Sequence, residues 1–224
     1  MSGSSTFGLG ATGNYGTQGV AAVTNVPGAR SSAVALTDAS GNLWLFGGNG
    51  ANCPSSSGSI ECRGGNGPFL NDLWEFNVSS DQWTWVSGSD TGNAEGAYGS
   101  LGVAAVTNVP GARSSAVGWT DSSGNLWLFG GGLSSENLDG GYGNDLWEFN
   151  PTKKMWTWVG GSSTDSALGV YGTLGTPSSG NVPGARGESV SWSDSTGNLW
   201  LFGGDGEDAA GNEGDLNDLW RYQP

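Results

Sequence analysis

The chain has 224 residues, of which 12% are charged, and its 21 acidic and 7 basic residues give a net charge of −14. Because nucleic-acid binding depends on Lys and Arg side chains that neutralise phosphates, this charge excludes nucleic acid as an expected partner. It also argues against anionic membranes, and no apolar run approaches the roughly 18 residues of a membrane span. The 43 glycines have no three-residue period, which is typical of many turns.

The chain opens with residues 1–14, which have neither a basic nor an apolar signal-peptide region. They resemble the linker around Gly161–Thr164, so we expect a leader of the inter-unit type. If the parent protein is exported, its signal has been removed.

Four motifs then recur in one order and phase, and they divide the chain into units at 15–97, 98–170 and 171–224. The third unit ends before a fourth motif. Gly19–Val34 is identical to Gly102–Val117, which indicates recent duplication or design and leaves a natural chain, a fragment and an engineered repeat open. The motifs are Pro-Gly-Ala-Arg ending at Arg30, Arg113 and Arg186; Asn-Leu-Trp-Leu-Phe-Gly-Gly from Asn42, Asn125 and Asn198; Asn-Asp-Leu-Trp from Asn71, Asn144 and Asn217; and Trp-Thr-Trp-Val from Trp83 and Trp156.

Each unit is predicted to hold four short antiparallel strands, because Trp, Phe, Leu and Val alternate between Gly, Asn, Asp and Ser. In the first unit these strands are expected at Ser31–Thr37, Leu43–Phe46, Leu73–Asn77 and Gln82–Val86. No helical period is sustained, so the predicted fold class is all-β. The third unit is expected to lack its fourth strand.

The first unit carries an enlarged loop at 49–70, where the other units have shorter segments at 132–143 and 205–216. Both cysteines, Cys53 and Cys62, lie in this loop. A disulfide that closes the loop would suit an oxidising compartment, and free thiols remain the alternative. Two cysteines without histidine cannot form a four-ligand zinc site.

The ordered motifs, from Arg30 through Leu43–Gly48 to Asn71–Asn77 and Trp83, resemble the Kelch repeat, in the style of bacterial repeats related to the central domain of galactose oxidase. The resemblance covers Tyr15 to the end of the chain. It implies a β-propeller of four-stranded blades, with three blades per chain. Since propellers have roughly four to eight blades, we expect two chains to close into a six-bladed homodimer.

The copper chemistry of galactose oxidase needs histidine ligands, and this sequence has none, so that activity does not carry over. Histidine-based triads are excluded for the same reason. Carboxylate chemistry stays open, but the acidic residues recur at equivalent positions, which favours structural roles. The same argument favours the twelve tryptophans as core over sugar-stacking platforms. The equivalent acidic sets are Asp38, Asp121 and Asp194, and Asp72, Asp145 and Asp218.

Long connections are expected on one face of the propeller, where recognition sites usually lie. On that face, Arg30, Arg113 and Arg186 could form a ring that binds an anion, or each could bond carbonyls or an aspartate between blades. The acidic residues Asp205, Glu207, Asp208 and Asp215 could hold Ca²⁺ or form a solvated loop. No other cofactor is expected.

These features favour a non-catalytic binding or scaffold module that assembles with itself, from a secreted or cell-surface bacterial protein. A glycan-binding lectin that uses the long-loop face is the first alternative. A hydrolase or lyase that uses the loop carboxylates is the second. A glycan or a protein remains open as the ligand.

Overall fold

The computed structural model describes residues 12–50, 67–134 and 140–224, and within these ranges the chain forms strands and no helix. The all-β prediction is therefore confirmed. All strand pairs are antiparallel, as expected for consecutive short strands joined by turns. The described part of the chain contains no helix long and apolar enough to cross a membrane.

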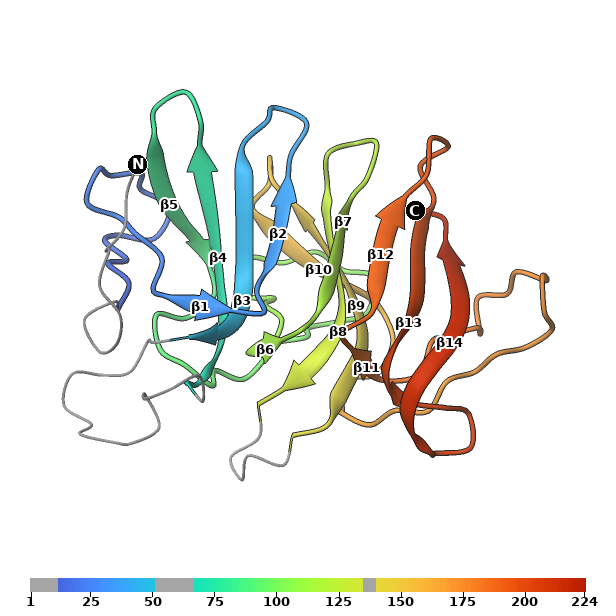
Figure 1. Ribbon diagram of the computed structural model, residues 1–224. Coiled ribbons are helices and arrows are strands. Elements are labelled where there is room, and N and C mark those ends of the chain that lie inside the picture. Colours follow the sequence, from blue (N-terminus) through green and yellow to red (C-terminus); the bar gives the residue numbers. More distant parts are fainter. Residues whose placement is uncertain (1–11, 51–66, 135–139) are drawn as a thin grey trace.

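The strands fall into three consecutive sets, which are called units 1, 2 and 3 (Figure 1). Unit 1 contains β1 (Arg30–Ser31), β2 (Val34–Thr37), β3 (Leu43–Gly50), β4 (Phe69–Asn77) and β5 (Gln82–Ser87). Unit 2 contains β6 (Arg113–Ser114), β7 (Val117–Thr120), β8 (Leu126–Leu133), β9 (Tyr142–Asn150) and β10 (Met155–Gly160). Unit 3 contains β11 (Arg186–Gly187), β12 (Val190–Ser193), β13 (Leu199–Glu207) and β14 (Glu213–Tyr222).

Each unit is a meander in which the first predicted strand is interrupted. In unit 1 both β1 and β2 pair with β3, which pairs with β4, which pairs with β5. The predicted continuous strand Ser31–Thr37 is broken because Ser32 takes a positive φ of 53°. Ser115 and Glu188 repeat this turn at φ 56° and 57°. Unit 3 has no counterpart of β5 in the described residues.

The second and third strands extend beyond their predicted ends, because the Gly-Gly doublet forms a β-bulge instead of ending the strand. The register of β8 with β9 shifts between Phe129 and Gly131, and pairing then continues to Gly132. The predicted loop at 205–216 is correspondingly shorter. Its two arms belong to β13 and β14, and only a turn at 208–212 connects them.

The Gly-Gly doublet also lets the next unit approach closely. A Cβ atom on Gly130, whose φ is 62°, would lie 2.5 Å from the carbonyl oxygen of Arg186 in unit 3. A Cβ atom on Gly47 would lie 2.9 Å from the carbonyl oxygen of Arg113 in unit 2. Only glycine can provide both this conformation and this clearance.

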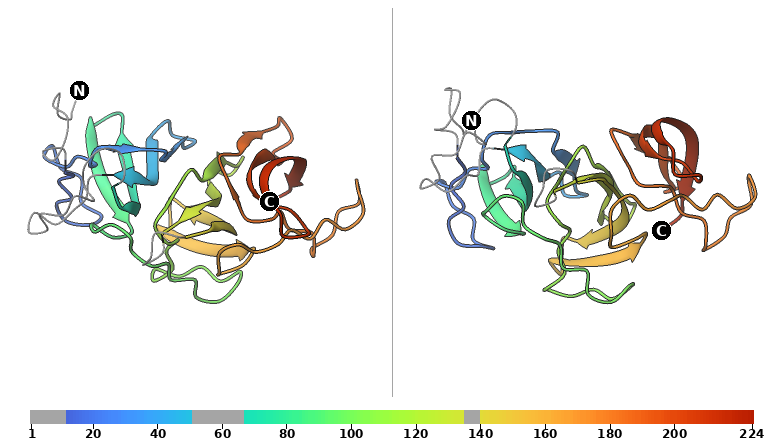
Figure 2. Two further views of the ribbon diagram at one scale, coloured as in Figure 1. Left: turned by 60° about the horizontal axis from the view of Figure 1, so that its bottom comes forward. Right: turned by 90° about the horizontal axis from the view of Figure 1, so that it is seen from below.

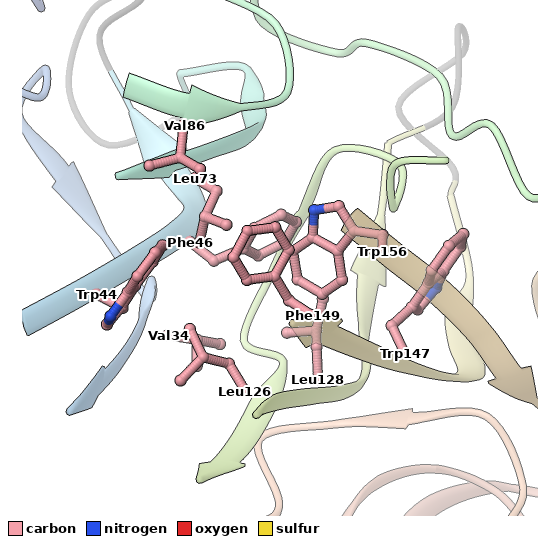
Figure 3. Close-up of a cluster of buried hydrophobic side chains, with 10 residues drawn as sticks. All are labelled: Val34, Trp44, Phe46, Leu73, Val86, Leu126, Leu128, Trp147, Phe149 and Trp156. Carbon is pink, nitrogen blue, oxygen red and sulfur yellow. The ribbon is translucent and has the colours of Figure 1, made fainter. Parts of the chain in front are cut away.

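The units lie side by side in a row, with units 1 and 3 at its ends (Figures 1 and 2). The core lies between neighbouring units. Between units 1 and 2, Phe46 and Leu73 pack against Leu128, Phe149 and Trp156 (Figure 3). Between units 2 and 3, Trp119 and Phe129 pack against Leu199 and Leu201, with Trp220 partly buried beside them. Both junctions therefore use equivalent positions of the repeat.

The bulge glycines provide a stability test. We expect Gly131→Ala to lower the free energy of unfolding by at least about 2 kcal/mol, because φ is 92° and the new Cβ would lie 2.6 Å from the Ser114 carbonyl oxygen. Gly160→Ala is the control, because its Cβ would meet nothing within 4 Å. Urea unfolding of both variants measures the difference, and equal stabilities would contradict this account of the doublet.

Candidate functional site

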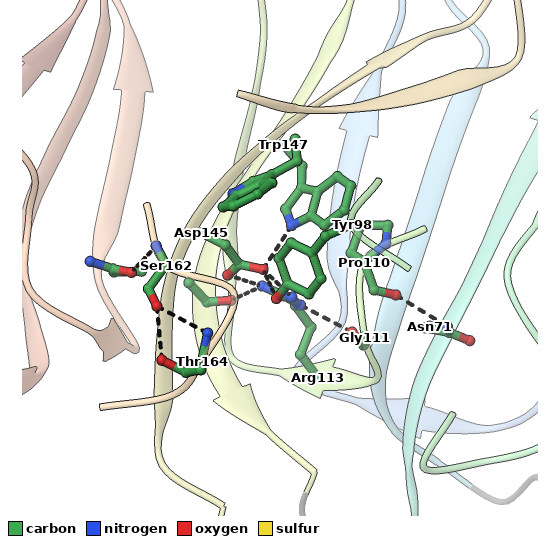
Figure 4. A network of polar contacts seen from close by, with 12 residues as sticks. Asn71, Tyr98, Pro110, Gly111, Arg113, Asp145, Trp147, Ser162 and Thr164 are labelled. Carbon is green, nitrogen blue, oxygen red and sulfur yellow. Dashed lines mark hydrogen bonds and ion pairs between the residues drawn. The ribbon is translucent and has the colours of Figure 1, made fainter. Parts of the chain in front are cut away.

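A buried polar network surrounds Arg113, one of the three arginines predicted to bind an anion (Figure 4). Its Nη1 and Nη2 atoms donate to the two carboxylate oxygens of Asp145 at 2.7 and 2.6 Å. Nη1 and Nε also donate to the carbonyl oxygens of Gly130 and Gly111. Asp145 Oδ2 accepts further bonds from Tyr98 Oη and Trp147 Nε1, both at 2.7 Å.

The same network recurs in the other two units. Asp72 accepts bonds from Arg30, Tyr15 and Trp74 in unit 1. In unit 3, Asp218 accepts bonds from Arg186, Tyr171 and Trp220. Each network joins three parts of one unit: the short strand that begins with the arginine (β1, β6 or β11), the strand that contains the aspartate (β4, β9 or β14), and the tyrosine 15 residues before the arginine.

The three guanidinium groups thus bond carbonyls and an aspartate, as in the second reading of the sequence, although each aspartate belongs to the same unit and not to its neighbour. The arginine side chains are almost completely buried. An anion could reach these donors only by displacing a bidentate carboxylate partner. Each set of one arginine, one aspartate, one tyrosine and one tryptophan is called a clamp, because its bonds hold segments of one unit together.

The charges of the clamps are held by their surroundings. Burial raises the pKa of the Tyr98 hydroxyl, and the adjacent Asp145 carboxylate raises it further. Burial also opposes ionisation of Asp145, but Arg113 outweighs it and keeps the pKa of that carboxyl below its usual value. For Asp218, the bonds from Arg186, Tyr171 and Trp220 overcome partial burial and lower the pKa to about 2.

The second repeated acidic set, Asp38, Asp121 and Asp194, stabilises the turn that follows β2, β7 or β12 in each unit. Asp38 Oδ1 accepts bonds from the backbone amides of Ser40 and Asn42, and its Oδ2 accepts one from Trp44 Nε1. Asp121 and Asp194 make equivalent bonds to Trp127 and Trp200. These carboxylates are therefore used in the turns, as their repeat-equivalent placement predicts.

The four predicted calcium ligands lie along the β13–β14 hairpin. Asp205 pairs with Asp215 across it, Glu207 lies two residues further, and Asp208 accepts three bonds from Ala210 and Asn212 in the turn. Among the described residues, no group of three or more carboxylates is arranged to hold a metal ion. The Ca²⁺ interpretation gains no geometric support here.

A groove of about 490 Å³ separates the long-loop ends of units 2 and 3. Four carboxylates line it together with Tyr142, whose hydroxyl donates to Asp205 at 2.9 Å. Burial and Asp205 raise the pKa of Tyr142 to about 12. Such a lining favours cationic over anionic groups. The carboxylates belong to Glu188, Asp205, Glu207 and Glu213.

An exposed apolar surface marks the unit 3 end of the row, and it is called the forward face. It consists of Val190, Trp192, Phe202 and Leu219, and Phe202 and Leu219 are 43% and 55% exposed. The equivalent residues of units 1 and 2 cover the next unit, and Phe46 and Phe129 are both 4% exposed. The forward face of unit 3 is therefore a junction surface that no other unit covers within the described residues.

The opposite end carries the matching surface, called the rear face, which consists of Leu43, Leu45, Phe76 and Trp83 in unit 1. Leu43 is 45% exposed, while its equivalents Leu126 and Leu199 are each 2% exposed. At the internal junctions, rear-face residues pack against the forward face of the preceding unit. The two ends of the row thus present complementary halves of one junction.

Two elements of the sequence analysis fare differently. Cys53 and Cys62 lie outside the described residues, so their pairing stays a prediction. The buried Tyr–Arg–Asp–Trp clamps are not identified from the sequence, although Tyr precedes Arg by 15 residues in every unit and Asp follows Arg by 42, 32 and 32 residues. The ten extra residues in unit 1 lie in its enlarged loop at 49–70, so the order Tyr, Arg, Asp is the signal that the three units share.

No protein-family model matches the sequence, and no curated protein is significantly similar to it. Among solved structures, the chain is similar to the structure of YjhT, with 15% sequence identity and a TM-score of 0.45. The aligned region covers 86% of this chain and 37% of that one.

The clamps predict a large loss of stability when one partner is neutralised. Asp145→Asn should lower the free energy of unfolding by about 3–5 kcal/mol, because it leaves the buried Arg113 charge without its carboxylate. Asp121→Asn serves as the control and should cost less, because the asparagine oxygen can keep the two backbone bonds of the turn and only the bonds from the Asn125 and Trp127 side chains are lost. Denaturant unfolding compares them, and similar losses would contradict the structural importance of the clamp.

The Asp218 clamp also predicts how stability depends on pH. The carboxyl has a pKa of about 2 in the folded chain and about 3.9 when unfolded. Its contribution is therefore complete above about pH 4 and disappears as the pH falls towards 2. Unfolding of the native chain and Asp218→Asn between pH 7 and pH 2 should converge in acid. Parallel curves throughout would contradict the assignment.

Proposed function

We propose that the chain is a non-catalytic binding and scaffold module of the β-propeller type, in which each unit is a Kelch-like blade and two copies join end to end. The observation that carries this proposal is the exposure of the forward face on unit 3 and of the rear face on unit 1. Large exposed apolar patches usually mark association surfaces.

The partner that fits best is a second copy of the chain, because both internal junctions already pair these surfaces. A forward face that meets the rear face of another chain would recreate the packing between units 1 and 2. Two such contacts would close six blades into a ring, within the usual size range of propellers. The contact is heterologous, so closure requires a suitable rotation per chain.

Polar groups at the two ends support the same pairing. Asn71 and Asn144 donate to the carbonyl oxygens of Pro110 and Pro183 in the following unit, at 3.1 Å. Their equivalent, Asn217, lies exposed on unit 3. In a closed ring Asn217 would face Pro27 of the second copy. The ends therefore match in hydrogen-bonding groups as well as in apolar shape.

A non-catalytic role is supported by how the acidic side chains are used. Asp145 is occupied by its clamp, and Asp121 by its turn, and both have equivalents in the other units. The sequence contains no histidine that could act as a general base. The arrangement therefore favours scaffold functions over hydrolysis or elimination.

Sedimentation velocity over a range of concentrations tests the proposal. The native chain should sediment with twice the 22.7 kDa chain mass. Phe202→Asp should sediment as a monomer, because a charge would be buried at the centre of the contact. Val106→Asp is the control, since Val106 is exposed on a linker. A folded native monomer at every concentration, or a Phe202→Asp variant that still associates, would overturn it.

A further inference from the structure

The outer edge of unit 3 carries a second feature, distinct from the forward face. In units 1 and 2, a fourth strand covers the edge of the third strand, where Trp74 pairs with Trp85 and Phe76 pairs with Trp83. Among the described residues, β14 pairs only with β13, and its other edge has no partner strand. Leu219–Tyr222 therefore presents a row of backbone groups able to accept another strand.

In units 1 and 2, the linker segment before the first strand bonds to the fourth strand of the same unit, along the edge that does not pair with the third strand. In unit 2, Gly102 N donates to the Trp158 carbonyl oxygen at 2.8 Å, and Asn108 Nδ2 donates to that of Trp156 at 3.1 Å. Unit 1 repeats both bonds, from Gly19 to Trp85 and from Asn25 to Trp83. The linker and the third strand thus form the two walls of a slot.

Unit 3 keeps both walls of this slot. Asn181 Nδ2 donates to the Thr176 carbonyl oxygen at 3.1 Å, as Asn108 Nδ2 donates to that of Val103 at 2.8 Å in unit 2. The Tyr171 and Trp220 rings lie 5.0 Å apart, close to the 4.9 Å between Tyr98 and Trp147. The slot is therefore already shaped for its occupant, which lowers the cost of binding.

The occupants of the filled slots define the ligand chemistry. The first tryptophan of the strand, Trp156, contacts Trp147 and Phe149, and the second, Trp158, meets the edge of Tyr98. Unit 3 presents Trp220, Tyr222 and Tyr171 at these positions. A groove of about 480 Å³ also runs past Tyr222, between it and Val159 of unit 2.

We propose that the slot of unit 3, between β14 and residues 170–182, binds an extended peptide strand of the pattern Trp-x-Trp-Val. The peptide adds to the edge of β14 as a fourth antiparallel strand, with its tryptophans in the positions of Trp156 and Trp158. This β-augmentation goes beyond end-to-end assembly, because it uses the sheet edge instead of the forward face.

A labelled synthetic peptide of residues Thr152–Ser162 tests the proposal by fluorescence anisotropy. The protein is the Phe202→Asp variant, so that a failure of end-to-end assembly cannot be confused with a failure of strand binding. We expect saturable binding with one peptide per chain. The peptide with W156A and W158A should bind at least roughly tenfold more weakly. Absence of saturable binding, or equal binding of the two peptides, would overturn the proposal.

Two further measurements locate the site. Asn181→Ala should weaken binding roughly fivefold, because it removes one hydrogen bond to the strand, while the exposed-linker variant Val106→Ala should bind as before. Hydrogen exchange of the amides at Leu219–Tyr222 should slow when the peptide is added. Binding that leaves their exchange unchanged would place the peptide elsewhere and contradict the slot.

Discussion

A small antiparallel sheet with apolar side chains on both faces cannot bury them alone, and it needs a neighbour on each side. In this chain every unit is such a meander, and a single bridge between Leu70 and Arg113 links the meanders of units 1 and 2. Phe46 reaches forward to the next unit, and Phe149 reaches back to the previous one. The inner unit has both neighbours, whereas units 1 and 3 each leave one face exposed. This imbalance motivates the proposed function, because the two bare faces are halves of the same contact.

The polar interior serves the same arrangement. The clamp formed by Arg113 and Asp145 ties β6 to β9, the two strands from which these side chains come. The Gly-Gly doublet of unit 1 lets β6, the strand that contains Arg113, approach closely. In unit 3 the Asp218 carboxylate is less covered than its equivalents, since the described residues place no fourth strand over it. The edge slot is thus also the place where the third clamp meets solvent.

Much of the fold could be predicted because the repeats are in phase. The sequence predicts the fourth strand at Gln82–Val86, one residue shorter than β5, because the two tryptophans recur there with period two. The break at Ser32 was not foreseen, because a serine with positive φ has no strong local signature. For the site, Arg30 was singled out by its rarity and position, but its partner Asp72 lies 42 residues away, and the sequence cannot show that contact by local pattern alone.

The central claim is that the forward face of one chain contacts the rear face of another. Electron microscopy of the purified protein at micromolar concentration tests it most directly, because class averages reveal how the ends meet. The account predicts closed rings of two chains, each contributing three units, with every forward face against a rear face. Open arcs with both ends bare, or pairs joined through two forward faces, would contradict it.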